Sequence, residues 1–209
     1  MTERLRGLYA VTSAALCREP ARLAAAVAAA LGGGARLIQY RDKDSAAATR
    51  TAIARELLVL CRARGARLII NDDAALAAAI GADGVHLGAS DLPLRDARRR
   101  LGDAAIIGVS CSNRLERAVA AQDQGASYVA FGRFFPSRTK PEAPGAELSL
   151  LQQARRTLRI PLCAIGGITP DHAPAVIAAG ADLVAAVEGV FGAPDVTGAA
   201  RAYARLFVE

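Results

Sequence analysis

The chain has few aromatic residues and no block of one charge. Its 209 residues are 53% hydrophobic, whereas Phe, Trp and Tyr together make up only 4%. The aromatic residues are not interleaved with the basic ones, so the stacking platforms that bind single-stranded nucleic acid are missing. We therefore interpret the net charge of +6 as a charged surface with a site for small anions, and expect no nucleic-acid partner.

Cysteines are also few, and long apolar runs are lacking. The four cysteines are scattered without a Cys-x-x-Cys pair, which argues against a zinc site and a disulfide framework and suits reduced thiols. Residues 1–8 are polar and basic, unlike a signal peptide, and the Ala-rich run 23–31 is too short to span a membrane. We expect a cytoplasmic protein with no membrane partner.

The dipeptide Gly-Ala recurs just ahead of short apolar runs. Each of these glycines follows a helical pattern, where a left-handed residue ends a helix at little cost. Each run that follows is a short buried strand by length and composition. The predicted strands span residues 8–12, 37–41, 68–71, 84–87, 106–110, 128–131, 161–165 and 183–187.

Strands that alternate with helices in this way indicate a parallel sheet covered on its faces. We predict a single-domain (β/α)₈ TIM barrel over residues 1–209, at the lower end of the usual size. A doubly wound open sheet is the main alternative. It would need no eighth strand, and the Gly-rich nucleotide turn that it often carries is absent after the first strand. Residues 132–146 are expected to form a lid after the sixth strand.

Several polar residues are predicted to begin helices. Ser45 precedes an Ala-rich segment, and Thr169 precedes Pro170 and Asp171, which suit the first turn of a helix. Asp73 is predicted to cap the helix that follows the third strand. His86 is interpreted as a packed, hydrogen-bonded core residue and His172 as a surface residue, which leaves no histidine base at the rim.

The working face of such a barrel lies at the carboxyl ends of its strands. Gln39, Arg41 and Lys43 alternate with Tyr40 and Asp42, so period-2 geometry turns the first three to one side. They suit a clamp for a diphosphate, with bidentate Arg and Lys as a point charge. Ordinary solvated charges are the alternative; the clamp is favoured because Gln and Arg in an apolar strand need a buried partner.

Asp72 and Asp91 stand at the exits of consecutive strands. They could share one hard cation, which prefers oxygen ligands and keeps several waters. Each also precedes a helical pattern that it could cap. Asn71 is placed to bind a phosphate oxygen, and Ser110 either does the same or caps the next helix.

Glycines follow the last two strands. Gly166 and Gly167 come after the seventh, and Glu188 with Gly189 after the eighth. This placement matches the usual barrel phosphate site, in which backbone N–H groups and a short helix hold the anion.

Together these rim residues resemble the thiamine-phosphate synthase family, from the first strand to Pro194. The motifs that carry the resemblance are Gln39-Tyr-Arg-Asp-Lys43, Ile70-Asn-Asp72, Ala82-Asp-Gly-Val-His-Leu-Gly88 with Asp91, Gly108-Val-Ser110, Phe135-Pro-Ser-Arg-Thr-Lys140 and Ala164-Ile-Gly-Gly-Ile168. The family is a (β/α)₈ barrel. It joins 4-amino-2-methyl-5-hydroxymethylpyrimidine diphosphate to a thiazole phosphate with Mg²⁺ and releases diphosphate.

The resemblance implies a role for each matching residue. The pyrimidine diphosphate would be bound by Gln39, Tyr40, Arg41, Asp42, Lys43, Asn71, Ser110 and Lys140, of which Arg41, Lys43, Ser110 and Lys140 would be catalytic. Mg²⁺ would be held by Asp72 and Asp91. The thiazole would be contacted by Ser137, Arg138 and Thr139, and its phosphate by Gly167, Val187 and Glu188. A rim with cations and a metal but no base suits ionisation of a diphosphate leaving group.

Three positions depart from the family pattern: Ala89 where Gln is frequent, Ser112 where His is frequent, and Glu188 where Ser is usual. A carboxylate repels a phosphate, so we expect the Glu188 side chain to point away. A thiazole tautomerase is the nearest rival, but its histidine position holds Ser112. A non-catalytic phosphate-binding sensor is the second rival; the metal, clamp and lid residues argue against it. No oligomeric state is predicted.

Overall fold

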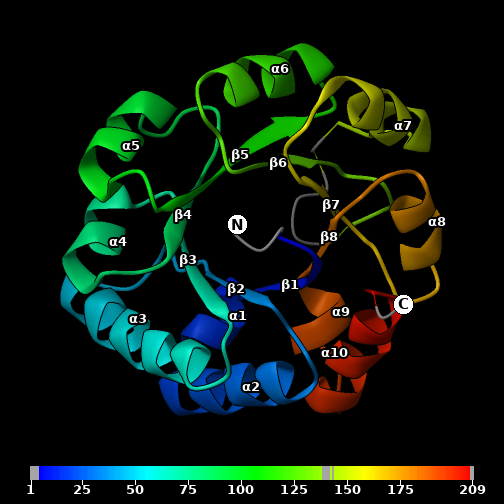
Figure 1. The fold of residues 1–209 in the computed structure, drawn as a ribbon. Coiled ribbons are helices and arrows are strands. Elements are labelled where there is room, and N and C mark those ends of the chain that lie inside the picture. The colour runs from blue at the N-terminus through cyan, green and yellow to red at the C-terminus, as the bar shows by residue number, and fades with distance from the viewer. Residues whose placement is uncertain (1–4, 138–141, 143, 208–209) are drawn as a thin grey trace.

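The structure, a computed structural model, describes residues 5–137, 142 and 144–207. Eight parallel strands close into a barrel in chain order (Figure 1). They are β1 Gly7–Val11, β2 Leu37–Tyr40, β3 Arg67–Asn71, β4 Gly84–Leu87, β5 Ile106–Ser112, β6 Tyr128–Phe131, β7 Leu162–Ile165 and β8 Leu183–Ala186. The predicted TIM barrel is confirmed, and the pairing of β8 with β1 excludes the open sheet.

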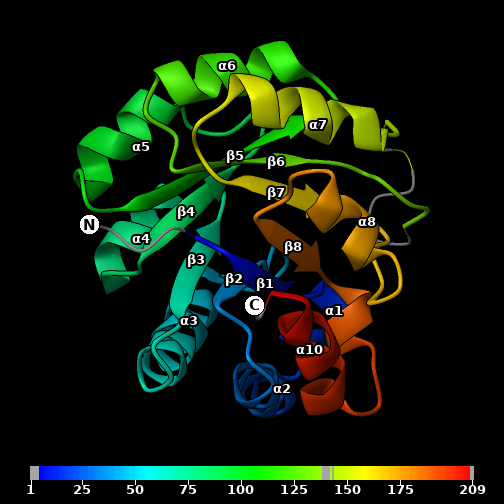
Figure 2. The ribbon, with the colours of Figure 1, turned by 45° about the vertical axis from the view of Figure 1, so that its right-hand side comes forward.

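The helices form a ring outside the barrel (Figures 1 and 2). They are α1 Ala14–Cys17, α2 Pro20–Gly32, α3 Ala47–Arg62, α4 Ala74–Ile80, α5 Leu94–Leu101, α6 Leu115–Asp123, α7 Leu148–Thr157, α8 Ala173–Ala178, α9 Glu188–Phe191, α10 Val196–Ala204 and the 3₁₀ turn η1 Arg205–Phe207. Helix α10 packs on α2 and on β1, which closes the ring. No helix in the described part of the chain is long and apolar enough to cross a membrane.

Alternation along the strands divides the core into two layers. On β1, Leu8 and Ala10 face the helices, whereas Tyr9 and Val11 face the barrel lumen. Tyr128 on β6 also belongs to the inner layer, and both tyrosines are fully buried. The lumen is therefore filled by side chains below the carboxyl ends of the strands, and the catalytic site of such a barrel lies at that end.

The helix ends test the capping predictions. Asp73 caps α4 as predicted, because its Oδ1 accepts a 2.8 Å hydrogen bond from the Leu76 N–H. The prediction for Ser45 is wrong: α3 begins at Ala47, and the Ser45 N–H donates instead to Asp42. Thr169 caps the turn that leads into α8: its Oγ1 accepts a 3.4 Å hydrogen bond from the His172 N–H, although the helix itself begins only at Ala173. The glycines of the repeated Gly-Ala pairs all have positive φ, as expected of helix-ending residues.

Candidate active site

The carboxyl ends of the strands surround a cavity of about 440 Å³. Most of the predicted site residues that the structure describes line it, although they come from six different strands or the loops that follow them. These are Gln39, Arg41, Lys43, Asn71, Asp72, Ser110, Ser137, Gly167, Val187 and Glu188. The structure thus brings together residues that are up to about 150 positions apart in the sequence, as the barrel topology requires.

The loop after β2 carries the predicted cationic clamp. Gln39 is buried, and its Nε2 donates a 2.7 Å hydrogen bond to Tyr9 Oη, which is the buried partner expected for it. The Arg41 N–H donates to Thr12 Oγ1 at 2.8 Å, and this bond ties the loop to the end of β1. Arg41 and Lys43 both line the cavity, so the period-2 prediction for their direction is confirmed.

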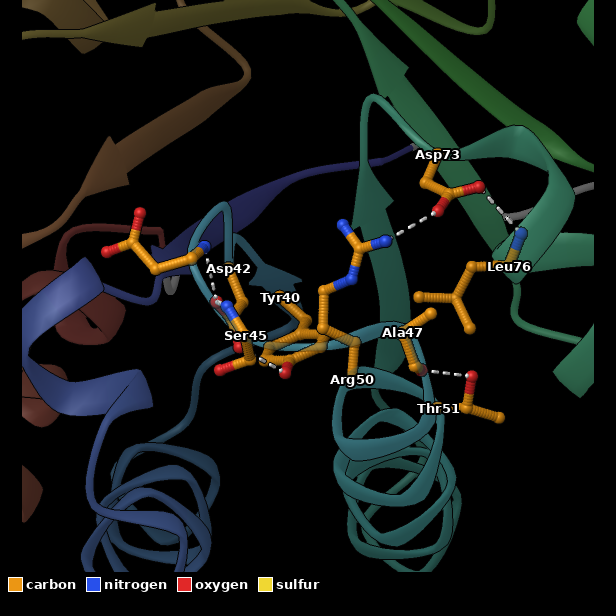
Figure 3. A network of polar contacts seen from close by, with 9 residues as sticks. Tyr40, Asp42, Ser45, Ala47, Arg50, Thr51, Asp73 and Leu76 are labelled. Carbon is orange, nitrogen blue, oxygen red and sulfur yellow. Dashed lines mark hydrogen bonds and ion pairs between the residues drawn. The ribbon is translucent and has the colours of Figure 1, made fainter.

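Tyr40 and Asp42 face the opposite way and do not line the cavity, so their predicted contact with substrate stays a prediction. Tyr40 is buried in the layer between barrel and helices, and its Oη donates to Asp42 Oδ2 at 2.8 Å (Figure 3). Asp42 Oδ1 accepts from the N–H groups of Asp44 and Ser45, each at 3.1 Å. Burial raises the pKa of Asp42, but the hydrogen bonds from Ser45, Tyr40 and Asp44 together outweigh it and keep the pKa below its ordinary value.

Arg50 supports the loop after β3 from outside the cavity. It lies on α3, and its Nη2 is 3.6 Å from Asp73 Oδ2, so it links that helix to the loop after β3 (Figure 3). Its Nε is buried without a hydrogen-bond partner in the described part of the chain. No motif surrounds Arg50 in the sequence, and only the packing of α3 beside the third strand brings it to Asp73.

The carboxylate of Asp72 is turned to the rim by an unusual backbone. Asp72 has φ of 62°, a left-handed conformation that Asp tolerates better than most residues, and its N–H donates to the His86 carbonyl at 2.8 Å. Lys43 Nζ lies 2.9 Å from Asp72 Oδ2. Burial raises the pKa of Asp72, yet the hydrogen bonds with Lys43, Asp91 and Asn71 and the charge of Lys43 together outweigh it, so that pKa lies below its ordinary value.

Asp91 stands beside Asp72, just outside the cavity lining. Its Oδ2 accepts a 2.6 Å hydrogen bond from the Gly88 N–H. Burial raises the pKa of Asp91, the Gly88 N–H opposes this, and the adjacent Asp72 raises it further. Two carboxylates in contact repel each other unless a cation lies between them.

This pair of carboxylates fits Mg²⁺. No cluster of three or more His, Cys, Asp or Glu side chains occurs in the parts of the chain that the structure describes. A site with fewer protein ligands is what Mg²⁺ usually has, because it keeps several waters and binds substrate phosphate oxygens. The oxygen-only donors of Asp72 and Asp91 therefore suit a hard cation that a diphosphate helps to bind.

Across the cavity, Gly166 and Gly167 form a backbone cradle. Their φ angles of 104° and 62° favour glycine, and a Cβ on Gly167 would clash with the carbonyl of Pro136. Glu188 begins α9, with Val187 as N-cap. The Glu188 carboxylate points toward the carboxyl end of α9, since a Cβ built on Gly192 would lie 2.6 Å from Glu188 Oε2.

His86 is a packed, hydrogen-bonded residue as predicted, but it also lines the cavity. Its Nδ1 is 2.8 Å from Tyr128 Oη, and its Nε2 is 2.8 Å from Ser110 Oγ. Ser110 therefore does not cap the following helix, which begins at Leu115. The other histidine, His172, is less of a surface residue than predicted, since it stacks on Phe135 with ring centroids 3.9 Å apart.

The loop after β6 contributes Ser137 and also Arg133, a cavity residue that sequence reasoning missed. The predicted site residues Arg138, Thr139 and Lys140 lie outside the described residues, as does part of the expected lid.

The sequence model of the thiamine monophosphate synthase family matches residues 8–190. The chain belongs to this family. It is 55% identical to the thiamine-phosphate synthase of Thioalkalivibrio sulfidiphilus over 98% of this chain and 97% of that one. For the thiamine-phosphate synthase of Nitrosococcus oceani, the identity is 53% over 99% and 95% of the two chains.

Solved structures agree with this family assignment. The thiamine phosphate pyrophosphorylase from Pyrococcus furiosus superposes with a TM-score of 0.86 at 33% identity, over 98% of this chain and 96% of that one. A 3-hexulose-6-phosphate synthase, at 19% identity and a TM-score of 0.66, shares the fold. The predicted thiamine-phosphate synthase family, and with it the predicted transferase class, is confirmed.

Proposed function

We propose that the protein joins 4-amino-2-methyl-5-hydroxymethylpyrimidine diphosphate to a thiazole phosphate and releases diphosphate, with Mg²⁺ as cofactor. One observation carries the proposal: a single cavity has cationic side chains and the Asp72 carboxylate on one wall, with Asp91 beside it at the rim, and a glycine cradle on the other. Such a cavity has separate places for two anionic groups. The name of the family gives the product, thiamine phosphate.

In this proposal the first wall holds the diphosphate. Arg41 would bind it through two parallel N–H groups and Lys43 as a point charge, while Asn71 would donate from its amide. Asp72 and Asp91 would hold Mg²⁺. Bound Mg²⁺ supplies charge neutralisation for a departing diphosphate.

The reaction needs no general base. The C–O bond between the pyrimidine methylene and the diphosphate breaks, and both electrons leave with the diphosphate. The thiazole nitrogen then uses its lone pair to form the new C–N bond, and it has no proton to lose. This suits the cavity wall, where both ring nitrogens of His86 are already engaged by Tyr128 and Ser110. Preorganised donors that stabilise a developing charge account for such catalysis.

The second wall would hold the thiazole phosphate through the N–H groups around Gly167 and the first turn of α9. The two rival functions are less well supported. A tautomerase needs a proton-transfer residue, and the expected position is Ser112, which lines the cavity with a hydroxyl of ordinarily very weak acidity. A non-catalytic sensor needs no carboxylate pair beside a cationic clamp.

The decisive experiment incubates purified protein with both substrates and Mg²⁺ and measures thiamine phosphate and diphosphate. We expect the two products in equal amounts, and none after EDTA treatment until Mg²⁺ is restored. A protein with native circular dichroism but no product above background would refute the synthase proposal. Conversion of one thiazole tautomer to another without pyrimidine diphosphate would favour the tautomerase.

A further inference from the structure

Five side chains form one continuous hydrogen-bonded chain across the barrel lumen, at the floor of the cavity. Gln39 Nε2 is 2.7 Å from Tyr9 Oη, which is 2.9 Å from Tyr128 Oη. Tyr128 Oη is 2.8 Å from His86 Nδ1, and His86 Nε2 is 2.8 Å from Ser110 Oγ. The two ends, Gln39 and Ser110, are predicted substrate residues. The three residues between them have no role in the function described so far.

The row of hydrogen bonds can cross the barrel lumen only because β5 has a glycine between His86 and Tyr128. His86, Gly108 and Tyr128 are register partners on β4, β5 and β6. Residues two strands apart are separated by roughly 10 Å, which would normally keep their side chains apart. Here the Tyr128 ring lies over Gly108, where a Cβ would clash with it, and stacks on His86 with centroids 5.6 Å apart.

The Gln39 amide sets the direction in which the hydrogen bonds of this row are donated, from Gln39 toward Ser110. An amide N–H can only donate, so Tyr9 Oη accepts from Gln39. The buried Tyr9 proton then needs an acceptor, and among the described residues Tyr128 Oη is the one within hydrogen-bond distance. Tyr128 in turn donates to His86 Nδ1, which must then be the unprotonated nitrogen. The proton of the neutral ring is therefore on Nε2 and points to Ser110 Oγ. Burial raises the pKa of both tyrosines, so each keeps the proton that this order requires.

The direction decides what each end presents to the cavity. Ser110 Oγ accepts from His86, so its own proton is available to a ligand. The amide oxygen of Gln39 is likewise an available acceptor. Neither of these groups has another hydrogen-bond partner within the described part of the chain. If every hydrogen bond were donated in the opposite direction, Ser110 Oγ would present only lone pairs to the cavity and the Gln39 amide would present its N–H group.

We propose that Tyr9, Tyr128 and His86 are positioning residues that fix this direction in the free protein, so that Ser110 donates and the Gln39 carbonyl accepts. The identity of the bound groups rests on the function proposed above. A donor at Ser110 suits an anionic diphosphate oxygen, and an acceptor at Gln39 suits the amino group of the pyrimidine. The reverse order would aim lone pairs at the diphosphate.

The first test is the histidine tautomer, measured by ¹⁵N NMR on the substrate-free protein well above the ordinary histidine pKa of about 6.5. The chain has two histidines, and a His172→Gln variant assigns the signals. We expect the proton of His86 on Nε2. A proton on Nδ1, or on both nitrogens, would overturn the proposal. This measurement needs no turnover, so it stands even if the proposed reaction fails.

The second test asks whether Tyr128 acts through Ser110. Tyr128→Phe should lower kcat/KM for the pyrimidine diphosphate about tenfold and leave KM for the thiazole phosphate within about twofold, since one hydrogen bond is weakened. In a Ser110→Ala background the same change should have little further effect. Fully additive losses would show that Tyr128 does not act through Ser110.

A matched control separates the effect of hydrogen-bond direction from the effect of altering a buried tyrosine. Tyr203 is another buried tyrosine that takes no part in this row of hydrogen bonds. Its Oη donates to the Ile168 carbonyl at 2.7 Å. Tyr203→Phe should leave the His86 tautomer signals unchanged, whereas Tyr128→Phe should shift them toward a mixture of tautomers. Unchanged His86 signals in Tyr128→Phe would refute the proposal. If Tyr128→Phe does not fold, the tautomer of the unaltered protein decides.

Discussion

The ammonium group of Lys43 lies 2.9 Å from the Asp72 carboxylate and joins the loops after β2 and β3 at the rim of the cavity. Both side chains are partly exposed, so the pair contributes little to stability. Its importance is geometric. It places a predicted diphosphate ligand and a predicted metal ligand on one wall, so a bound diphosphate and its Mg²⁺ would meet there.

Asp72→Asn should lower kcat by about a hundredfold or more, because a metal ligand and its charge are lost. Asn also tolerates the left-handed backbone at this position, so the melting temperature should change little. Steady-state kinetics at varied Mg²⁺ and a thermal melt provide the measurements. Turnover close to normal with an unaltered Mg²⁺ dependence would remove Asp72 from the site.

The neighbouring Asp73 is the matched control. Its carboxylate caps α4 and contacts Arg50, and it does not line the cavity. Asp73→Ala should lower the free energy of unfolding by about 1 kcal/mol, as expected for a lost N-cap. Its kcat should stay within a few-fold of the original. A larger loss of kcat than in Asp72→Asn would reverse the two assignments.

Glu188→Ser should leave KM for the thiazole phosphate equal or lower. The glutamate carboxylate turns toward Gly192, and its removal takes a negative charge away from the proposed phosphate cradle. KM for the thiazole phosphate, measured at saturating pyrimidine diphosphate, tests this. A large rise in that KM would mean that the carboxylate has a positive role in binding.

Gly108→Ala should destabilise the barrel by about 1–3 kcal/mol, because the added Cβ overlaps the Tyr128 ring in a packed core. Urea unfolding measures the loss. Gly65→Ala is the control: Gly65 also resists substitution through its φ of 64°, yet a Cβ there meets nothing within 4 Å. That variant should lose about 1 kcal/mol and keep its kcat. A loss of stability in Gly108→Ala no larger than that in Gly65→Ala would contradict the packing argument.

Stability should fall as the pH rises above about 9. Burial raises the pKa of Cys17 from 9.0 to about 11, and the pKa values of Cys61 and Cys111 to about 12. Above pH 9 the unfolded thiols lose protons that the folded protein retains. The folded state then binds more protons, and its free energy of unfolding decreases with pH.

Urea unfolding at a series of alkaline pH values measures this decrease. Cys61→Ala should have a shallower decline than the unaltered protein, although it starts from a lower stability. Thiol-specific reagents should react slowly with the folded protein and with all four cysteines after unfolding. Rapid modification of a cysteine in the folded protein would contradict the buried, protonated state.

The strand pattern was predictable because it depends on local sequence. Short apolar runs separated by helical patterns and glycines placed every strand within two residues of its observed bounds. Prediction was poorer at the helix starts. Ser45 has a residue type that caps helices, but the loop after β2 uses its N–H to bind Asp42, and a competing tertiary contact of this kind leaves no local signal.

The site residues divide in the same way. Period-2 alternation correctly predicted that Gln39, Arg41 and Lys43 face the cavity, and the same rule turns Tyr40 and Asp42 away from it. Arg133 lines the cavity but carries no motif, so nothing local marks it. His86 was correctly expected to be hydrogen-bonded, but its partners Tyr128 and Ser110 lie on other strands.

The sequence by itself determined the barrel, the family and the residues of the rim, because periodicity and motif spacing are properties of neighbouring positions. Only the tertiary structure decided which of those residues meet. The parallel pairing of β2 with β3 brings Asp72 to Lys43, and the missing side chain of Gly108 lets Tyr128 reach His86 across a strand. Contacts between distant strands depend on the register and twist of the whole sheet, which no local stretch of sequence encodes.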